Sequence, residues 1–117
     1  MTTILYVEDH PPAQLLMQAI VGDLTAYRLI LAKSGEEALA QAAAHQPDLY
    51  ILDFDLPDTD GIALARELYQ LRPAPIILVS AYAEAMRSEQ FADIAFHYLA
   101  KPLDPDHVAE TIQRALA

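Results

Sequence analysis

The chain has 117 residues and a formal net charge of −10, with only seven lysines and arginines. This length fits one ordinary domain with a single core. An apolar content of 54% excludes an intrinsically disordered chain. The scarcity of basic residues argues against direct binding to nucleic acid or to an anionic membrane surface. Cysteine is absent, which excludes disulfides, a thiol nucleophile and a zinc knuckle.

The start of the chain, MTTILYVED, has no positively charged region and reaches acidic residues too soon for a secretory signal. No apolar run approaches the roughly 20 residues that a membrane-spanning helix requires. These two observations favour a cytoplasmic protein that does not act at a membrane.

Short apolar runs alternate with segments of helical periodicity along the whole chain. In chain order we expect a strand at 3–7, a helix at 11–23, a strand at 27–32, a helix at 34–45, a strand at 48–53, a helix at 61–71, a strand at 76–80, a weaker helix at 84–92, a strand at 96–100 and a helix at 104–117. This alternation predicts one α/β domain over 1–117, with a doubly wound, five-stranded parallel sheet flanked by five helices. The expected strand order is the flavodoxin-like 2-1-3-4-5.

Local signals support several of these elements. Pro12 suits the first position of the first helix and Gly22 suits its end. The apolar residues that share a face of this helix are Leu15, Leu16, Ala19 and Ile20. Ser34, with Glu37 three residues later, predicts a capping box at the start of the second helix. Asp104 is the expected cap of the last helix, whose inward residues are Val108, Ile112 and Ala115.

Polar residues follow four of the five predicted strands. Glu8 and Asp9 come after the first strand, Asp53 ends the third, Ser80 ends the fourth and Lys101 follows the fifth. The carboxyl ends of parallel strands lie on one edge of the sheet, where such folds bind ligands. We therefore expect these side chains to meet there, with Asp9 beside Asp53 if the first and third strands are neighbours.

Carboxylates that meet in this way repel one another and raise one another's pKa unless a cation joins them. Mg²⁺, or Mn²⁺ in its place, suits such a site because it prefers carboxylate oxygens and completes its shell with water and phosphate oxygens. Lys101 and Ser80 suit a phosphoryl group better than a bare metal site. An aspartate that accepted this group would form an acyl phosphate.

Four short motifs carry a family resemblance: ED at 8–9, LDFDLPDTDG at 52–61, VSA at 79–81 and YLAKP at 98–102. In order and spacing they resemble the receiver domain of bacterial two-component response regulators, of the chemotaxis-regulator-like kind, over the whole chain. The resemblance implies a phosphoacceptor domain that a sensor histidine kinase or a histidine phosphotransfer protein phosphorylates. Such a domain is not an enzyme with a separate substrate, since it catalyses only its own phosphorylation and slow autodephosphorylation.

The family's roles carry over to matching residues. Asp53 resembles the phosphoryl acceptor and Lys101 the lysine that binds the phosphoryl group. Asp9 resembles a direct magnesium ligand, and Glu8 the second acid, which acts through water. The backbone carbonyl of Asp55 matches the third protein ligand. The acid pair is Glu-Asp where Asp-Asp is common, which lengthens one side chain and keeps its charge.

The resemblance also implies a switch and two rate-tuning positions. Ser80 and Tyr98 match the switch pair, and the peptide bond before Pro102 is usually cis in this family. Tyr82 and the Asp55 side chain match positions that tune the lifetime of the phosphoryl group. The output face would combine the fourth helix, the fifth strand and the fifth helix, and would bind a downstream effector or form a homodimer.

Three other functions compete with this interpretation. DFD at 53–55 resembles the nucleophile motif of haloacid-dehalogenase-like phosphatases, but in those enzymes the acid pair comes last rather than first. A calcium loop from Leu56 would lack a ligand at its first position and would follow a strand. The residues at its other matching positions are Asp58, Asp60, Gly61 and Glu67. A flavin phosphate would be repelled by EDHPPA in the first loop.

The sequence leaves open whether the chain acts as a stand-alone receiver, as part of a longer regulator or as part of a hybrid kinase. It identifies neither the kinase nor the output.

Overall fold

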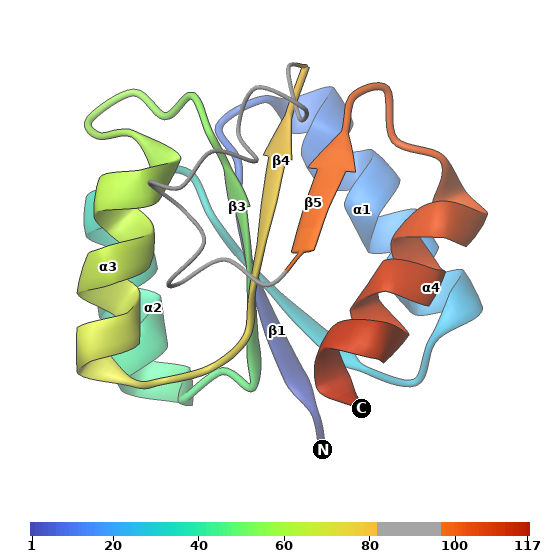
Figure 1. Cartoon of the computed structure of the whole chain (residues 1–117), viewed down its shortest axis with the longest axis horizontal. Coiled ribbons are helices and arrows are strands. Elements are labelled where there is room, and N and C mark those ends of the chain that lie inside the picture. Colours follow the sequence, from blue (N-terminus) through green and yellow to red (C-terminus); the bar gives the residue numbers. More distant parts are fainter. Residues whose placement is uncertain (82–96) are drawn as a thin grey trace.

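A computed structural model of the chain describes residues 1–81 and 97–117, in which strands and helices alternate (Figure 1). The elements are β1 (Thr3–Val7), α1 (Pro11–Leu24), β2 (Arg28–Ala32), α2 (Gly35–His45), β3 (Leu49–Asp53), α3 (Gly61–Leu71), β4 (Ile76–Ser80), β5 (His97–Ala100) and α4 (Pro105–Leu116). The helix labelled α4 is the one expected at 104–117. The helix expected at 84–92 lies outside the described residues, so four of the five expected helices are described.

The five strands form one sheet in the order β2-β1-β3-β4-β5, and all neighbouring strands are parallel. This confirms the expected doubly wound fold. Figure 1 shows α2 and α3 on one side of the sheet and α1 and α4 on the other. In the described parts of the chain, every helix is too short or too polar to span a membrane.

The sheet separates two apolar clusters because successive strand residues point to opposite faces. In β1, Leu5 and Val7 pack with α2 and α3, while Ile4 and Tyr6 pack with α1 and α4. All residues of β1, β3 and β4 are buried. Burial on both faces is typical of central parallel strands, and it explains why these segments are apolar without a polar alternation.

The buried face of α1 differs from the expected one. Leu15 is 66% exposed and Leu16 is 38% exposed. The buried residues of this helix are Met17, Ile20 and Val21. The helix begins at Pro11 rather than Pro12, and Gly22 lies inside it rather than at its end. Because α1 is apolar around most of its circumference, helical spacing alone does not select the face that contacts the sheet.

Three other local expectations concern the starts of two helices and the loop after β5. The Ser34 hydroxyl accepts a hydrogen bond from the Glu37 amide at 3.1 Å, which confirms the predicted cap of α2. Asp104 is the N-cap residue of α4, although its side chain makes no capping hydrogen bond. The Lys101–Pro102 peptide bond is cis, as the family resemblance implied.

The connection from β3 to α3 is closed tightly at its base. The Gly61 amide donates to the Phe54 carbonyl at 2.8 Å, and Asp55 forms an isolated antiparallel bridge with Asp60. The Asp60 carboxylate caps α3 by accepting from the amides of Ile62 and Ala63 at 2.9 and 2.8 Å. A Cβ atom at Gly61 would lie 2.8 Å from the Asp53 carbonyl oxygen and 2.9 Å from the Phe54 Cα.

We therefore predict that Gly61→Ala lowers the free energy of unfolding by about 1 to 3 kcal/mol, because the added methyl group displaces backbone. Gly22→Ala is the matched control, since a Cβ atom there meets nothing within 4 Å. It should stabilise the protein by about 0.5 to 1 kcal/mol, as alanine favours a helix interior over glycine. Urea denaturation followed by circular dichroism measures both, and equal effects of the two substitutions would contradict the prediction.

Candidate functional site

Three carboxylates meet at the carboxyl edge of the sheet. One ligand oxygen from each of Glu8, Asp9 and Asp53 lies within 4.8 Å of the other two. β1 and β3 are neighbours in the sheet, so the residues at their ends lie side by side. The convergence of Asp9 with Asp53, which depended on this strand order, is therefore present in the structure.

Lys101 reaches the same cluster from the end of β5. Its ammonium nitrogen lies 3.2 Å from Asp53 Oδ1 and 3.3 Å from Glu8 Oε1. The Lys101 amide also donates to the Ser80 carbonyl at 3.0 Å, which fixes the lysine backbone against the end of β4. A long side chain is needed here because β4 lies between β3 and β5 in the sheet.

Burial differs among these charged groups. Glu8 and Asp53 are buried, with 1% and 4% of their surface exposed, whereas Asp9 is exposed. Within the cluster, one ammonium group faces three carboxylates. Buried carboxylates with too little compensating charge either take up a proton or bind a cation.

Glu8 is held by several hydrogen bonds besides its contact with Lys101. The Tyr6 hydroxyl donates to Glu8 Oε1 at 3.5 Å, and the Asp9 amide donates to Glu8 Oε2 at 3.1 Å. The Gln14 side-chain amide donates to the Glu8 backbone carbonyl at 2.5 Å. Tyr6 was missed by the sequence analysis. Its signal was its place two residues before Glu8, which puts both on the same side of the chain.

Burial and neighbouring charges shift the pKa values of three groups in and around the cluster. Burial raises the pKa of Glu8 from its ordinary value of 4.5 to about 7, and a hydrogen bond with Asp53 and repulsion by its charge act in the same direction. Burial opposes the charge on Lys101, but the neighbouring Asp53 and Glu8 carboxylates outweigh it and raise the pKa of the lysine. Burial, followed by the charges of Glu8 and Asp53, raises the pKa of Tyr6.

This donor set fits a hard divalent cation. It offers carboxylate oxygens from an exposed and a buried acid, which Mg²⁺ and Mn²⁺ prefer. The pKa of Glu8 is raised, first by burial and then by Asp53, in spite of the neighbouring Lys101 ammonium group. A bound cation would supply the missing positive charge in place of the proton on Glu8.

The remaining predicted residues lie at or near this edge, with one exception. Asp55 is exposed at the start of the β3–α3 connection, and Ser80 is buried at the end of β4. Tyr98 is half-buried and packs against the apolar cluster beneath α2 and α3. Tyr82 lies outside the described residues.

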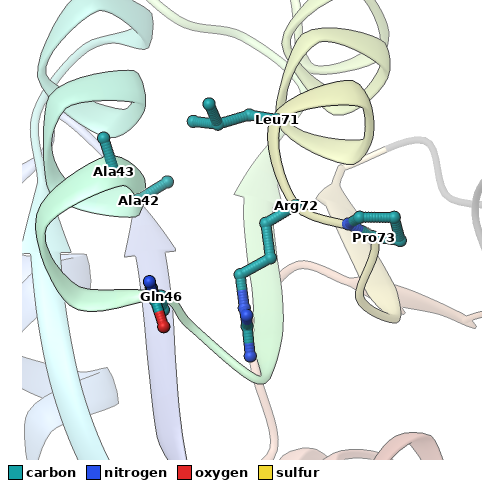
Figure 2. A pocket seen from close by; sticks show the side chains of 6 residues that line it. All are labelled: Ala42, Ala43, Gln46, Leu71, Arg72 and Pro73. Carbon is teal, nitrogen blue, oxygen red and sulfur yellow. The ribbon is translucent and has the colours of Figure 1, made fainter.

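A separate hollow of about 390 Å³ lies at the opposite edge of the sheet (Figure 2). Figure 2 shows side chains from the end of α2 on one side of it and Leu71, Arg72 and Pro73 on the other. Arg72 Nε donates to the Pro47 carbonyl at 2.9 Å, and its guanidinium lies 3.7 Å from Asp48. The Arg72 carbonyl accepts from the Tyr50 hydroxyl at 2.8 Å. Arg72 therefore joins the end of α3 to the start of β3, and this hollow is remote from the acidic cluster.

Comparisons with known proteins agree with this geometry. The family model for the response regulator receiver domain matches residues 4–113. The transcriptional regulatory protein ZraR of Salmonella typhimurium is 37% identical over 97% of the chain, and the KDP operon transcriptional regulatory protein KdpE of Escherichia coli is 37% identical over 99%. The chain spans only 26% and 52% of the lengths of these two relatives.

A solved structure of the response regulator protein TrrA from Thermotoga maritima, in complex with Mg²⁺ and BeF, is also similar. It shares 30% identity with a TM-score of 0.88, and the match covers 99% of this chain and 100% of that one. These matches give no support to the haloacid-dehalogenase-like phosphatase alternative.

The raised pKa of Glu8 predicts how stability changes with pH in the metal-free protein. Glu8 binds its proton more tightly in the folded than in the unfolded chain, so its contribution is full below pH 4.5 and is lost as the pH rises through about 7. Glu8→Gln should remove this loss. The difference in free energy of unfolding between wild type and variant should therefore change by about 1 to 2 kcal/mol over this range, allowing for solvent screening.

Urea denaturation in the presence of a chelator, at several pH values between about 4.5 and 7.5, measures this difference. Parallel pH dependence of the two proteins would contradict the prediction.

Proposed function

The chain belongs to the response regulator receiver domain family of two-component systems, and from this premise we propose that Asp53 is its phosphoryl acceptor. The observation that carries the proposal is the contact of Lys101 with Asp53 at 3.2 Å, beside the cluster of Glu8 and Asp9. The whole stretch 1–117 is proposed to act as one receiver domain. Receiver domains work with histidine kinases and effector domains.

In the proposed reaction, a carboxylate oxygen of Asp53 attacks the phosphorus atom of a phosphohistidine. A phosphorus–oxygen bond forms, the phosphorus–nitrogen bond breaks, and the imidazole of the donor leaves with the bonding electron pair. Lys101 then pairs with an oxygen of the phosphoryl group that Asp53 has acquired, and Ser80 donates its hydroxyl to another. Attack by water at the same phosphorus atom breaks the bond to the Asp53 oxygen, which restores the carboxylate and releases inorganic phosphate; this is the slow autodephosphorylation.

Mg²⁺, or Mn²⁺ in its place, would supply positive charge that offsets the carboxylates and the phosphoryl oxygens. We propose that Asp9 and Asp53 bind it directly, Glu8 through water, and Asp55 through its backbone carbonyl. The structure of TrrA with Mg²⁺ and BeF supports a cation at this edge, because that protein shares this fold over the whole chain.

The output of the domain is proposed to depend on Ser80 and Tyr98. Ser80 ends the buried strand β4, and the Tyr98 ring is half-buried in the next strand. Movement of the Ser80 hydroxyl toward the phosphoryl group would allow the Tyr98 ring to turn inward, which shifts a balance between two states. The changed face would include β5 and α4 and would bind an effector or a second copy of the chain. The Asp55 side chain and Tyr82 are proposed to tune the phosphoryl lifetime.

We predict that incubation with acetyl phosphate and Mg²⁺ adds one phosphoryl group to the wild-type chain. Asp53→Asn should abolish the modification, because an amide is not a nucleophile for this reaction. Lys101→Ala should slow it about 100-fold, because the developing charge loses its partner. Intact-mass measurement over time gives both results. Asp106→Asn, at an exposed acid in the first turn of α4, is the matched control. Full modification of the Asp53→Asn variant would refute the assignment.

A largely apolar surface on α1 lies beside Lys101. A hollow of about 260 Å³ beside Lys101 is lined by α1 and the loop after β5. A second hollow, of about 190 Å³, continues along α1 and shares Leu16 with the first. With Leu16, which is 38% exposed, at their centre, these hollows form a largely apolar surface that ends at the lysine. We propose that the phosphohistidine-bearing partner docks on it, because covering it seals the site from water.

Leu16→Glu should therefore reduce phosphoryl transfer from a histidine phosphotransfer protein by about tenfold or more, through lost docking. It should leave modification by acetyl phosphate unchanged, since that small donor needs no docking surface. Leu71→Glu is the matched control, since Leu71 is 50% exposed at the end of α3. Equal loss in the two variants, or a loss with acetyl phosphate, would contradict the proposed surface.

A further inference from the structure

The β3–α3 connection is attached to the start of α2 by one carboxylate. Asp58 Oδ1 accepts from the Gly35 amide at 2.8 Å, and Asp58 Oδ2 accepts from the Glu36 amide at 3.0 Å. These are the first two amides of α2, which have no partner within their own helix. The two hydrogen bonds lower the pKa of Asp58, which shows that they favour its charged form. A residue far away in the sequence therefore caps α2.

The packing around these hydrogen bonds is equally close. Gly35 is buried, and a Cβ atom on it would lie only 2.6 Å from the Thr59 Cγ2 atom. The connection thus lies directly against the first turn of α2. Any larger residue at position 35 would require the Thr59 side chain to move.

Asp58 holds the β3–α3 connection at a point away from the base of this loop. At the base, Gly61 bonds to Phe54, and Asp55 is bridged to Asp60. The short segment 55–57 leads from this base to Asp58, and it begins with Asp55, whose carbonyl is proposed to bind the cation. This segment has no regular secondary structure beyond that bridge. Its backbone therefore depends on attachments at both ends.

We propose that Asp58 is a positioning residue for the metal site: by holding the connection against the amides of Gly35 and Glu36, it keeps the Asp55 carbonyl in place. The inference rests on the proposed function, because it assumes that this carbonyl binds the cation. The competing explanation is that Asp58 only stabilises α2. Ser34 separates the two, because its hydroxyl caps the same helix through the Glu37 amide without involving the connection.

The test compares Asp58→Ala, Asp58→Asn and Ser34→Ala with the wild type. Mn²⁺ affinity of the unphosphorylated protein is measured by electron paramagnetic resonance of the free ion, and Mg²⁺ affinity by competition. We expect Asp58→Ala to weaken binding of both ions about tenfold, as is typical when a group that orients a metal ligand is lost. The affinity of Asp58→Asn, which retains one acceptor oxygen, should lie between those of the wild type and of Asp58→Ala. Ser34→Ala should stay within about twofold of the wild type, although it removes a comparable cap.

A kinetic measurement adds a second criterion. At saturating Mg²⁺, the rate of modification by acetyl phosphate should be close to that of wild type in Asp58→Ala, with the defect confined to the Mg²⁺ concentration required. An affinity of Asp58→Ala within about twofold of the wild type, or an equal loss in Ser34→Ala, would overturn the proposal. If Asp58→Ala does not fold, the ion affinity of Asp58→Asn takes its place: a value within about twofold of the wild type would overturn the proposal.

The outcome for Asp58 can be separated from the outcome for the proposed function. Ion binding is measured without any phosphoryl donor. If wild-type Asp53 takes up no phosphoryl group, the proposed function fails, and the affinities still decide the role of Asp58. If wild type is modified and the Asp58 variants bind ions normally, only the positioning role fails.

Discussion

The excess of negative charge at the carboxyl edge of the sheet is the constraint on which the rest of this structure depends. Three carboxylates lie within 4.8 Å of one another, and two of them are buried. Lys101 lies against both buried acids, yet burial and the neighbouring Asp53 still raise the pKa of Glu8. In the folded chain, a proton stabilises these carboxylates in part, and a divalent cation would stabilise them better. This need for positive charge makes the edge a site for chemistry as well as a structural feature.

The surrounding elements hold this unfavourable arrangement in place. β1 and β3 are buried on both faces, so the backbone that carries Glu8 and Asp53 is held by packing rather than by the charged groups. The close approach at Gly61 sets the start of α3 against the end of β3, and Asp58 attaches the loop before Gly61 to α2. The groups proposed to share a cation thus come from strand ends and from a loop. Different contacts hold the strands and the loop in place. This division is the reason why we propose that a loop residue without catalytic atoms influences the site.

The sequence predicted the fold and most of the candidate site because strong local patterns coincided. Five apolar segments with intervening helical periodicity predicted the parallel sheet, and the acids and the lysine at the strand ends predicted the convergence that Glu8, Asp9, Asp53 and Lys101 show. The prediction of the buried face of α1 was wrong, because its apolar residues surround most of the helix. Tyr6 was missed because a tyrosine within an apolar strand is usually part of the core. Asp58 was noticed only as a position in a calcium loop, whereas its oxygens accept from the amides of α2.

By itself, the sequence determined the order of strands and helices, the apolar character of the central strands and the kinds of polar group that follow four of the strands. These are properties of neighbouring residues along the chain. Only the tertiary structure decided which charged groups Lys101 contacts, which face of α1 is exposed and which helix Asp58 caps. Those outcomes depend on contacts between segments far apart in the sequence, such as Gly35 and Asp58, which are separated by 23 positions, and Glu8 and Lys101, which are separated by 93. Such contacts are set by how the sheet and its helices pack, and no local pattern contains them.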